Sequence, residues 1–230
     1  MNARSPLLLD PDDLLAAGAC ALGLELSPRQ IQAFRQYREE VARWSERMNL
    51  TALRTAEEIV REGFLDSLAC LRLVPTEASR TLDIGSGAGF PAIPIKLARP
   101  SLHLTLVEAA RKKATFLRHI VRCLDLQDVR VMRCRAEDLA VDPAEQGVYD
   151  LALARAVASL REQVRLAAPF LRPGGLFLAQ VGHGSIPQEA GLGHAVAGYE
   201  VAAEYALPPL LARPDRRVLG LRRLQGQPTA

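Results

Sequence analysis

Residues 81–90 read TLDIGSGAGF, and this stretch decides the fold. Leu82, Asp83 and Ile84 end a short run typical of a buried strand, and Gly85, Gly87 and Gly89 alternate after it before PAIPIKLA begins a helix. A strand, a glycine turn and a helix N-terminus together place free N–H groups at the C-terminal edge of a sheet. Glycine permits positive φ and the close approach of a ligand. The stretch therefore predicts a ligand-binding loop, with a purely structural turn as the alternative.

The prolines after the loop support the expected helix, and position 90 narrows the class of ligand. Pro91 and Pro94 lie in the first turn of the expected helix, where a missing N–H costs little. A dinucleotide fingerprint needs glycine at position 90, where this chain has Phe90, so a nicotinamide oxidoreductase is disfavoured. The pattern D-x-G-x-G-x-G resembles the cofactor loop of S-adenosylmethionine-dependent methyltransferases. The candidate cofactor-binding residues here are Asp83, Gly85, Ser86, Gly87, Gly89 and Phe90.

Composition bounds the remaining possibilities. The chain has 230 residues, of which 49% are hydrophobic, and this suits one large domain with an added segment. We expect no membrane span, no secretory signal and a cytoplasmic location. The four cysteines form no C-x-x-C pair and show no zinc-type spacing, so we expect no metal. The net charge of +3 is mild, and only its distribution could indicate nucleic acid.

The chain divides at about residue 75. Residues 1–75 are expected to be helical, with an apolar stripe at Ile31, Phe34, Val41, Trp44 and Met48 that predicts core packing. Residues 76–230 alternate between strands and helices, which predicts a doubly wound α/β domain. Seven strands are expected in a mostly parallel sheet with helices on both faces, the last two antiparallel: 81–84, 102–107, 129–134, 149–154, 176–181, 200–207 and 218–222. Residues 160–171 predict a helix and residues 172–175 a turn.

Polar residues follow several of these strands. Glu108, followed by Ala109, ends the second strand. In doubly wound nucleotide folds an acidic residue at this place accepts hydrogen bonds from ribose hydroxyls. Glu137, after Ala136, follows the third strand and could meet an adenine edge, although it could equally cap a helix. Arg155 ends the fourth strand at the edge where ligands bind.

A basic segment runs from residue 111 to residue 135, with eight basic against two acidic residues. This excess predicts a phosphate-facing surface, with an ordinary solvated helix face as the alternative. The candidate RNA-binding residues are Arg111, Lys112, Lys113 and Arg118.

With these residues in hand, the chain resembles the bacterial ribosomal RNA methyltransferase family first named glucose-inhibited division protein B. The resemblance covers about residues 28–222 and rests on five groups of letters: MNLTALR with LDSL, DIGSGAGFPAIPIKLARP, LVEAARKKATFLR, RAED and ARAVASL. It implies a class I, Rossmann-like methyltransferase fold with an N-terminal helical extension. It also implies S-adenosylmethionine contacts at Gly85, Phe90, Ala136, Glu137 and Arg155.

The resemblance implies methylation of guanine N7 in 16S ribosomal RNA, at the guanine of the 530 loop. Guanine N7 carries a lone pair and no proton, so transfer needs no general base and rests on positioning. Arg155 is the candidate catalytic residue. The expected partner is 16S RNA or the small ribosomal subunit, and we expect the protein to be a monomer.

Two departures favour an alternative. The family usually has His where this chain has Gly63, and Lys where it has Val181. The alternative is therefore a cofactor-binding, RNA-associated homologue with lost or altered activity.

Overall fold

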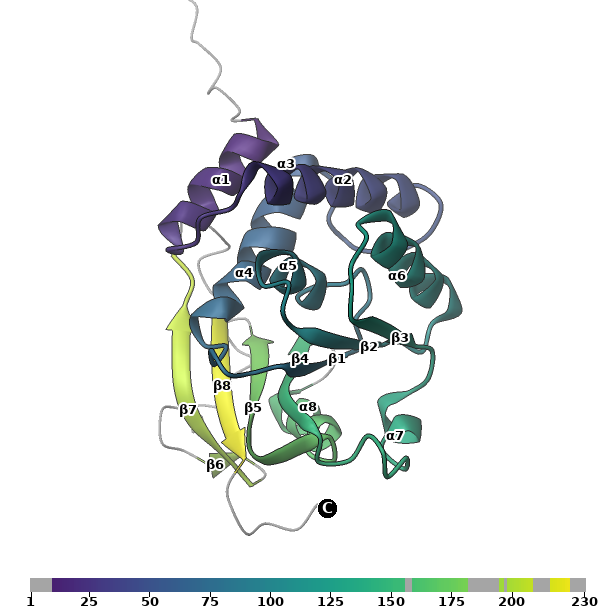
Figure 1. The fold of residues 1–230 in the computed structure, drawn as a ribbon, viewed down its shortest axis with the longest axis vertical. Helices are drawn as coiled ribbons and strands as arrows, with labels where there is room; N and C mark the ends of the chain where they lie inside the picture. The colour runs from purple at the N-terminus through teal and green to yellow at the C-terminus, as the bar shows by residue number, and fades with distance from the viewer. Residues whose placement is uncertain (1–9, 156–158, 182–194, 197, 209–215, 224–230) are drawn as a thin grey trace, which may run out of the picture.

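The computed structural model describes residues 10–155, 159–181, 195–196, 198–208 and 216–223. Its strands form one sheet in the order β3-β2-β1-β4-β5-β8-β7-β6 (Figure 1). The strands are β1 (Arg80–Ile84), β2 (His103–Val107), β3 (Val129–Met132), β4 (Tyr149–Arg155), β5 (Leu171–Val181), β6 (Ala195–Val196), β7 (Tyr199–Ala206) and β8 (Arg217–Arg223).

The sheet is parallel from β3 to β5 and antiparallel beyond it. Its order reverses between β1 and β4, so the C-terminal ends of these two strands flank the crevice where such folds bind ligands. The prediction of a mostly parallel, doubly wound sheet ending in two antiparallel strands is confirmed, and the two-residue β6 extends it beyond the seven strands expected.

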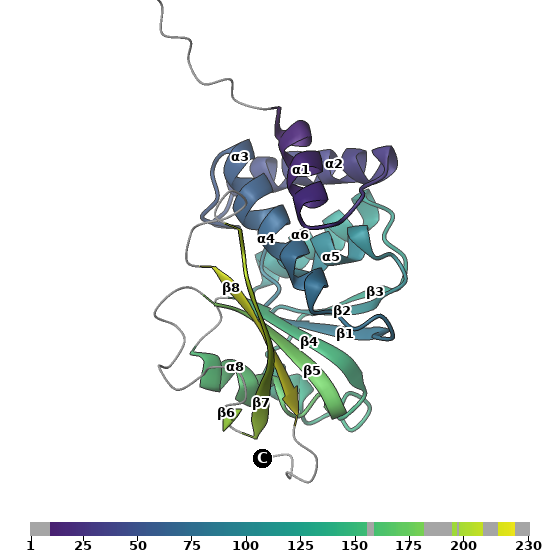
Figure 2. The same ribbon diagram turned by 90° about the vertical axis from the view of Figure 1, so that its left-hand side faces the viewer.

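Helices cover both faces of the sheet (Figures 1 and 2). One apolar cluster joins the N-terminal helices to α5 and α6, and a second lies under α7 and α8. The helices are α1 (Pro11–Ala21), α2 (Pro28–Ser45), α3 (Ala56–Glu58), a π-helical segment (Ile59–Leu65), α4 (Asp66–Ala69), a 3₁₀ turn (Cys70–Arg72), α5 (Ala92–Ala98), α6 (Arg111–Cys123), α7 (Ala136–Leu139) and α8 (Leu160–Ala167). In the described part of the chain, no helix has the length and apolarity needed to cross a membrane.

Capping residues fix where the N-terminal helices begin. Ser27 accepts from the Gln30 N–H at 3.3 Å, and Thr55 caps α3 in the same way. Proline at the start of α2 occupies a position whose N–H would have no partner. These helices share one core with α5 and α6, so the proposed boundary between residues 75 and 76 stays a prediction.

An aromatic cluster docks the N-terminal helices on the glycine loop. The Tyr37 ring, fully buried on α2, lies 5.3 Å from the Phe64 ring and 5.6 Å from the Phe90 ring. Its hydroxyl donates to the Ala88 carbonyl at 2.6 Å. Tyr37 completes the 34–37–41–44 stripe at helical spacing, which is the signal that would have revealed it.

Two boundary predictions were wrong. The helix expected to reach residue 171 ends at Ala167: Ala168 keeps helical dihedral angles, but Pro169 has no N–H with which to continue the helical hydrogen bonds. The strand expected to begin at residue 176 begins at Leu171, which pairs with Tyr149, so the expected turn at residues 172–175 lies inside β5. These four residues form the register irregularity between Tyr149 and Leu151, where Gly174 has φ +76°.

Replacing Tyr37 with phenylalanine should reduce stability. The Tyr37→Phe variant keeps the ring but leaves the Ala88 carbonyl without its donor, at a cost of about 1–3 kcal/mol. Denaturant unfolding measures the change. Tyr205→Phe, on a half-buried ring of β7, is the control and should change stability by under about 0.5 kcal/mol. Equal effects in the two variants would contradict the role given to this hydroxyl.

Candidate functional site

The glycine loop joins β1 to α5 and is held from the end of β2. The Gly85 and Ser86 N–H groups donate to the Val107 carbonyl at 2.9 and 3.0 Å. The Glu108 carboxylate accepts from the Gly87 N–H at 2.9 Å and from the Ala110 N–H at 2.8 Å. Glu108 therefore fixes the loop itself, and its remaining lone pairs are what it could offer a ligand.

Gly87 and Gly89 both have positive φ, but a side chain would meet different surroundings at each position. Gly89 has φ +91°, and a Cβ there would lie 2.6 Å from the Tyr37 hydroxyl oxygen, so its reason is close packing. Gly87 has φ +56°, and a Cβ there would meet only the Gly85 carbonyl, at 3.7 Å. The Cα of Gly87 thus faces open space, where a ligand can approach the backbone.

A cleft of about 520 Å³ opens over this loop. This volume falls in the range of small-molecule sites. The predicted residues that line it are Gly85, Ser86, Gly87, Phe90, Lys113 and Arg155. Residues that the sequence interpretation did not single out as site residues also line it: Leu50, Thr51, Ala52, Leu53, Glu58, Glu62, Ala88 and Arg216. The letters MNLTALR, used above only for the resemblance, supply four of these residues and were the available signal.

Six predicted cofactor residues do not line the cleft, and five of them are described first. Glu108 and Gly89 support the loop, and Ala109 follows Glu108 with an exposed side chain. Ala136 is buried at the start of α7, and Glu137 beside it is exposed. Asp83, discussed next, lies beneath the loop and makes six.

Asp83 is a buried acid without a hydrogen-bond partner. Its side chain is 1% exposed, and neither carboxyl oxygen has a partner among the described residues. Burial, with the Glu108 charge adding to it and the Ser86 hydroxyl opposing it, raises the pKa of Asp83 to about 8. Near pH 7 the group is therefore largely protonated, and a cationic partner would favour its ionised form.

Arg155 ends β4 beside the loop, since Ala154 pairs with Ile84. Its Nη2 lies 3.5 Å from Asp66 Oδ2, and Arg216 Nη1 lies 3.9 Å from the same oxygen. Burial raises the pKa of Asp66 and lowers the pKa of Arg155, while the attraction between the two charges opposes both shifts. Two arginines share one carboxylate, and Arg155 Nη1 has no hydrogen-bond partner among the described residues, so it remains a donor suited to an anion.

The Phe90 ring lies between Arg155 and Gly63, the position where the family usually has His. The Arg155 guanidinium lies 5.9 Å from the centroid of the Phe90 ring. A Cβ at Gly63 would lie 2.9 Å from Phe90 Cζ, so the ring fills the space that a side chain at position 63 would need. Val181 is 3% exposed in the second apolar cluster. Both departures therefore have a packing role, and Gly182 lies outside the described residues.

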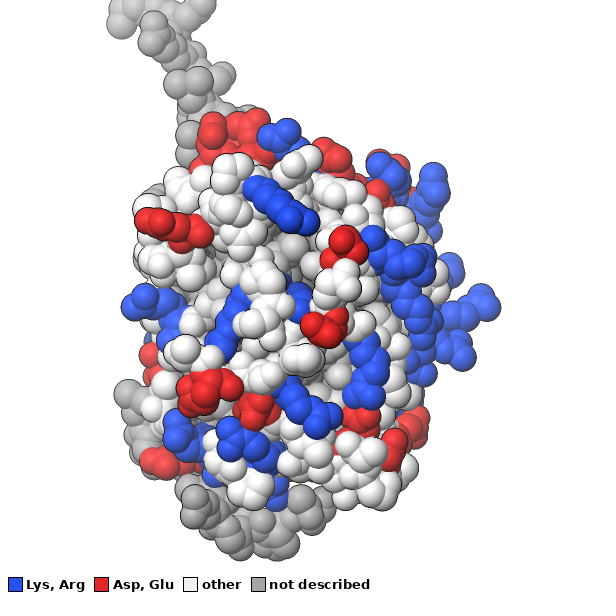
Figure 3. All heavy atoms as spheres, viewed as in Figure 1, with Lys and Arg blue, Asp and Glu red and all other residues white. Residues whose placement is uncertain are grey.

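The predicted RNA-binding residues lie on α6, beside the cleft. Arg111, Lys112 and Arg118 are exposed, and Lys113 is half-buried. Lys113 lines both the cleft and a second hollow between α2 and α6 that also contains Arg47. In Figure 3 the lysines and arginines gather along the side of the molecule where Figure 1 shows α6.

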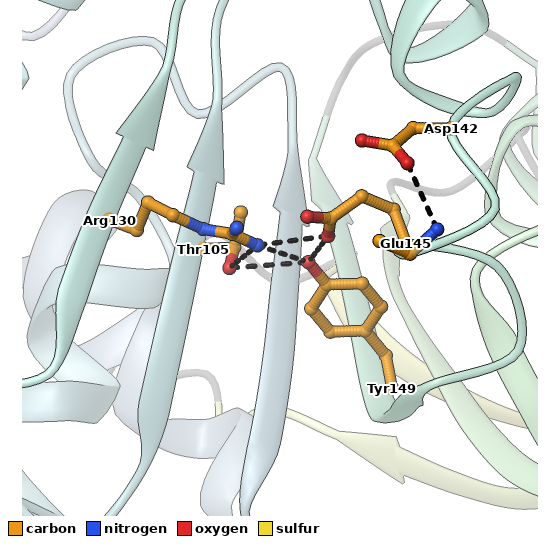
Figure 4. A network of polar contacts seen from close by, with 6 residues as sticks. Thr105, Arg130, Asp142, Glu145 and Tyr149 are labelled. Atoms are coloured by element: carbon orange, nitrogen blue, oxygen red, sulfur yellow. Dashed lines mark hydrogen bonds and ion pairs between the residues drawn. The ribbon is translucent and has the colours of Figure 1, made fainter.

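Arg130, counted above in the basic segment, is paired within the protein and does not belong to the basic surface on α6. Its Nη2 donates to Glu145 at 2.9 Å, to Tyr149 at 3.0 Å and to Thr105 at 3.2 Å (Figure 4). Tyr149 also donates to Glu145. This network lies toward the N-terminal ends of the strands, away from the cleft, and it neutralises one of the eight charges counted in the sequence.

A doubly wound sheet with a D-x-G-x-G-x-G loop at its switch point defines a class I S-adenosylmethionine-dependent methyltransferase. The family model described as rRNA small subunit methyltransferase G matches residues 30–191. The chain belongs to this ribosomal RNA methyltransferase family.

Individual relatives agree. The protein named ribosomal RNA small subunit methyltransferase G of Roseiflexus castenholzii is 48% identical over 74% of this chain and 73% of its own. The protein of the same name from Chloroflexus aggregans is 45% identical over 83% of this chain and 81% of its own. The solved structure of P. horikoshii TYW2 in complex with MeSAdo is 15% identical, with a TM-score of 0.51 over 76% of this chain and 66% of that chain. This last likeness concerns the fold alone.

Changing Gly87 to valine should abolish cofactor binding and leave the fold intact. The branched side chain would project into the open space over the loop. Calorimetric titration with S-adenosylmethionine measures binding. Gly147→Val is the control, because Gly147 has φ +62° with nothing within 4 Å of a Cβ, so it imposes similar backbone strain away from the cleft. Unchanged affinity in Gly87→Val would contradict the location of the site.

The raised pKa of Asp83 predicts a pH dependence of stability. A group whose pKa is higher in the folded than in the unfolded state stabilises at low pH, and this contribution is lost as pH rises through the folded pKa, here about 8. Relative to Asp83→Asn, the free protein should lose at most about 1.4 kcal/mol per pH unit between pH 5 and 8. Urea unfolding across this range measures the difference. Parallel profiles for the two proteins would show that Asp83 ionises normally.

Proposed function

We propose that this protein transfers a methyl group from S-adenosylmethionine to N7 of a guanine in 16S ribosomal RNA. The observation that carries the proposal is the composition of the cleft. One cleft is lined by the glycine loop, by Arg155 after β4 on one side of it and by Lys113 after β2 on the other, and Lys113 also lines the hollow at the basic surface. Such a lining suits a small cofactor on the loop with a nucleotide of a polyanion beside it.

The residues fit S-adenosylmethionine. Asp83 offers a buried carboxyl group without a partner, which suits a cationic group of the ligand. Gly87 leaves room for the ligand's approach, and Arg155 Nη1, without a hydrogen-bond partner among the described residues, could hold a carboxylate. When bound, S-adenosylmethionine supplies an electrophilic methyl group on a positively charged sulfur.

The protein's part in the reaction is positioning. Guanine N7 brings its own lone pair, so no residue has to remove a proton. Phe90 and Leu50 give the cleft an apolar wall that excludes water. Arg155 and Arg216, which share Asp66, would fix an anion beside this wall. Holding two reactants in contact in this way replaces a bimolecular encounter with a reaction between neighbours.

The alternative, a cofactor-binding homologue with lost or altered activity, rested on Gly63 and Val181. Both positions are packed in the fold: Phe90 occupies the space beside Gly63, and Val181 belongs to the apolar cluster. Packing thus accounts for both replacements, and transfer to guanine N7 needs no base that either absent group would have to supply. We therefore favour the active enzyme, acting as a monomer in the cytoplasm on 16S RNA or the small subunit.

Methyl transfer is the direct test. Small subunits that lack the modification are incubated with the protein and tritiated S-adenosylmethionine, and the labelled nucleoside is identified after digestion. We expect label in 7-methylguanosine from 16S RNA. Label in another nucleoside would refute the assignment to N7, and an absence of transfer despite cofactor binding would support the alternative. Protein-free 16S RNA in a parallel reaction identifies the form of the substrate.

Loss of Arg155 should reduce transfer strongly. Arg155→Ala removes the buried cation that faces the cleft, and transfer should fall at least about 100-fold, or about 2.7 kcal/mol of transition-state stabilisation. Because that variant leaves Asp66 buried with a weaker partner, Arg155→Lys, which keeps the charge and loses the planar fork, is measured beside it. Arg222→Ala, at an exposed arginine of β8, is the control. Near-normal transfer by folded Arg155→Ala would contradict the role of this residue.

The basic surface should act through phosphates. Replacing Lys112 and Lys113 with alanine should weaken RNA binding and lower the slope of log affinity against log salt by between about 1 and 2. Binding of free S-adenosylmethionine should change little. Replacing Arg161 and Arg165 with alanine removes two charges on α8, on the opposite face, and serves as the control. Identical salt slopes in the lysine variant and the wild type would argue against this surface.

A further inference from the structure

A cluster of three side chains with different ligating atoms lies between α2 and α6. Glu40 comes from α2, and His119 and Cys123 come from α6. One ligand atom from each lies within 4.8 Å of those of the other two. The closest pair, Glu40 Oε2 and His119 Nε2, is 2.8 Å apart. The cluster has no part in the cleft described above.

The local backbone brings these three atoms together. His119 and Cys123 are four residues apart on a helix and so share one face. Glu40 lies 79 residues before His119, and only the packing of α2 on α6 supplies it. A search for spacing within one segment therefore cannot find the set, which explains why the sequence analysis predicted no metal.

The surroundings support each ligating group. The Glu40 side chain is 8% exposed, and its other oxygen accepts from Arg43 Nη1 at 2.9 Å. The Gln36 side-chain amide donates to Cys123 Sγ at 3.0 Å. The Trp44 ring lies 5.3 Å from the His119 ring. Such outer contacts orient metal ligands in known sites.

We propose that Glu40, His119 and Cys123 bind one zinc ion, with water as the fourth ligand. Thiolate, imidazole and carboxylate together are a typical zinc donor set. Tetrahedral bonds of about 2.0–2.3 Å place ligand atoms about 3.3–3.6 Å apart, so the ion requires only small side-chain shifts. One thiolate and one carboxylate balance the charge of the ion. His119 is 33% exposed, which leaves water a route to the fourth position.

The ion would clamp the N-terminal helices to the core. Bound zinc would connect α2 to α6 a few residues from the basic surface, and it would stabilise the folded protein by binding it in preference to the unfolded chain. The inference does not depend on the proposed methyl transfer, because the cluster shares no residue with the cleft.

Cobalt titration of the chelator-treated, full-length protein tests the proposal. One equivalent of Co²⁺ should give a thiolate-to-cobalt band in the near ultraviolet and the strong visible absorption of a four-coordinate ion. Cys123→Ser should abolish the ultraviolet band, and Glu40→Gln and His119→Gln should each weaken binding at least about tenfold. Cys134→Ser changes another half-buried thiol and should leave the spectrum unaltered.

A second measurement needs no variant. Zn²⁺ at one equivalent should protect Cys123 of the wild-type protein from alkylation, as read by peptide mass spectrometry, while Cys134 and the exposed Cys20 react as before. Equal alkylation of Cys123 with and without zinc would overturn the proposal. A cobalt spectrum that survives Cys123→Ser, or the absence of any stoichiometric spectrum, would overturn it as well and leave the cluster as an ordinary ion pair.

Discussion

The glycine loop keeps its shape because the protein holds it from two sides. Glu108 binds the Gly87 N–H from the end of β2, and the Tyr37 hydroxyl of α2 binds the Ala88 carbonyl. A loop with positive-φ glycine at every second position has little conformational preference of its own and loses more entropy on ordering than a loop without glycine would. The N-terminal helices therefore help to shape the proposed cofactor site, since Tyr37 holds the loop from the side of α2.

Two buried carboxyl groups shape the electrostatics at the cleft. Asp66 is shared by Arg155 and Arg216, and Asp83 has no hydrogen-bond partner among the described residues. Burial keeps Asp83 largely neutral, and Arg155 Nη1 has no hydrogen-bond partner among the described residues. An acid and a guanidinium nitrogen without partners suit a ligand that carries charges of both signs, and they are costs that a structural turn would not need.

The sequence predicted what depends on local signals. The loop 81–90, the capping residues Ser27 and Thr55 and the alternation of strands with helices determined the architecture because each acts within a few residues. It did not predict contacts made by packing distant segments. Tyr37 meets Ala88 across 51 residues, and the basic segment hid the pairing of Arg130 with Glu145. Gly174 and its neighbours have the composition of a turn, and only the pairing of Leu171 and Leu176 with β4 on either side of them includes them in the strand.

Hydrogen exchange of backbone amides on adding S-adenosylmethionine tests the central claim most directly, because the claim concerns which backbone the cofactor touches. Peptides that cover residues 84–91 and 108–113 should exchange more slowly with the cofactor bound, while those of residues 142–149, at the N-terminal end of β4 and away from the cleft, should not change. Saturable binding of S-adenosylmethionine with unaltered exchange in residues 84–91 would contradict the account.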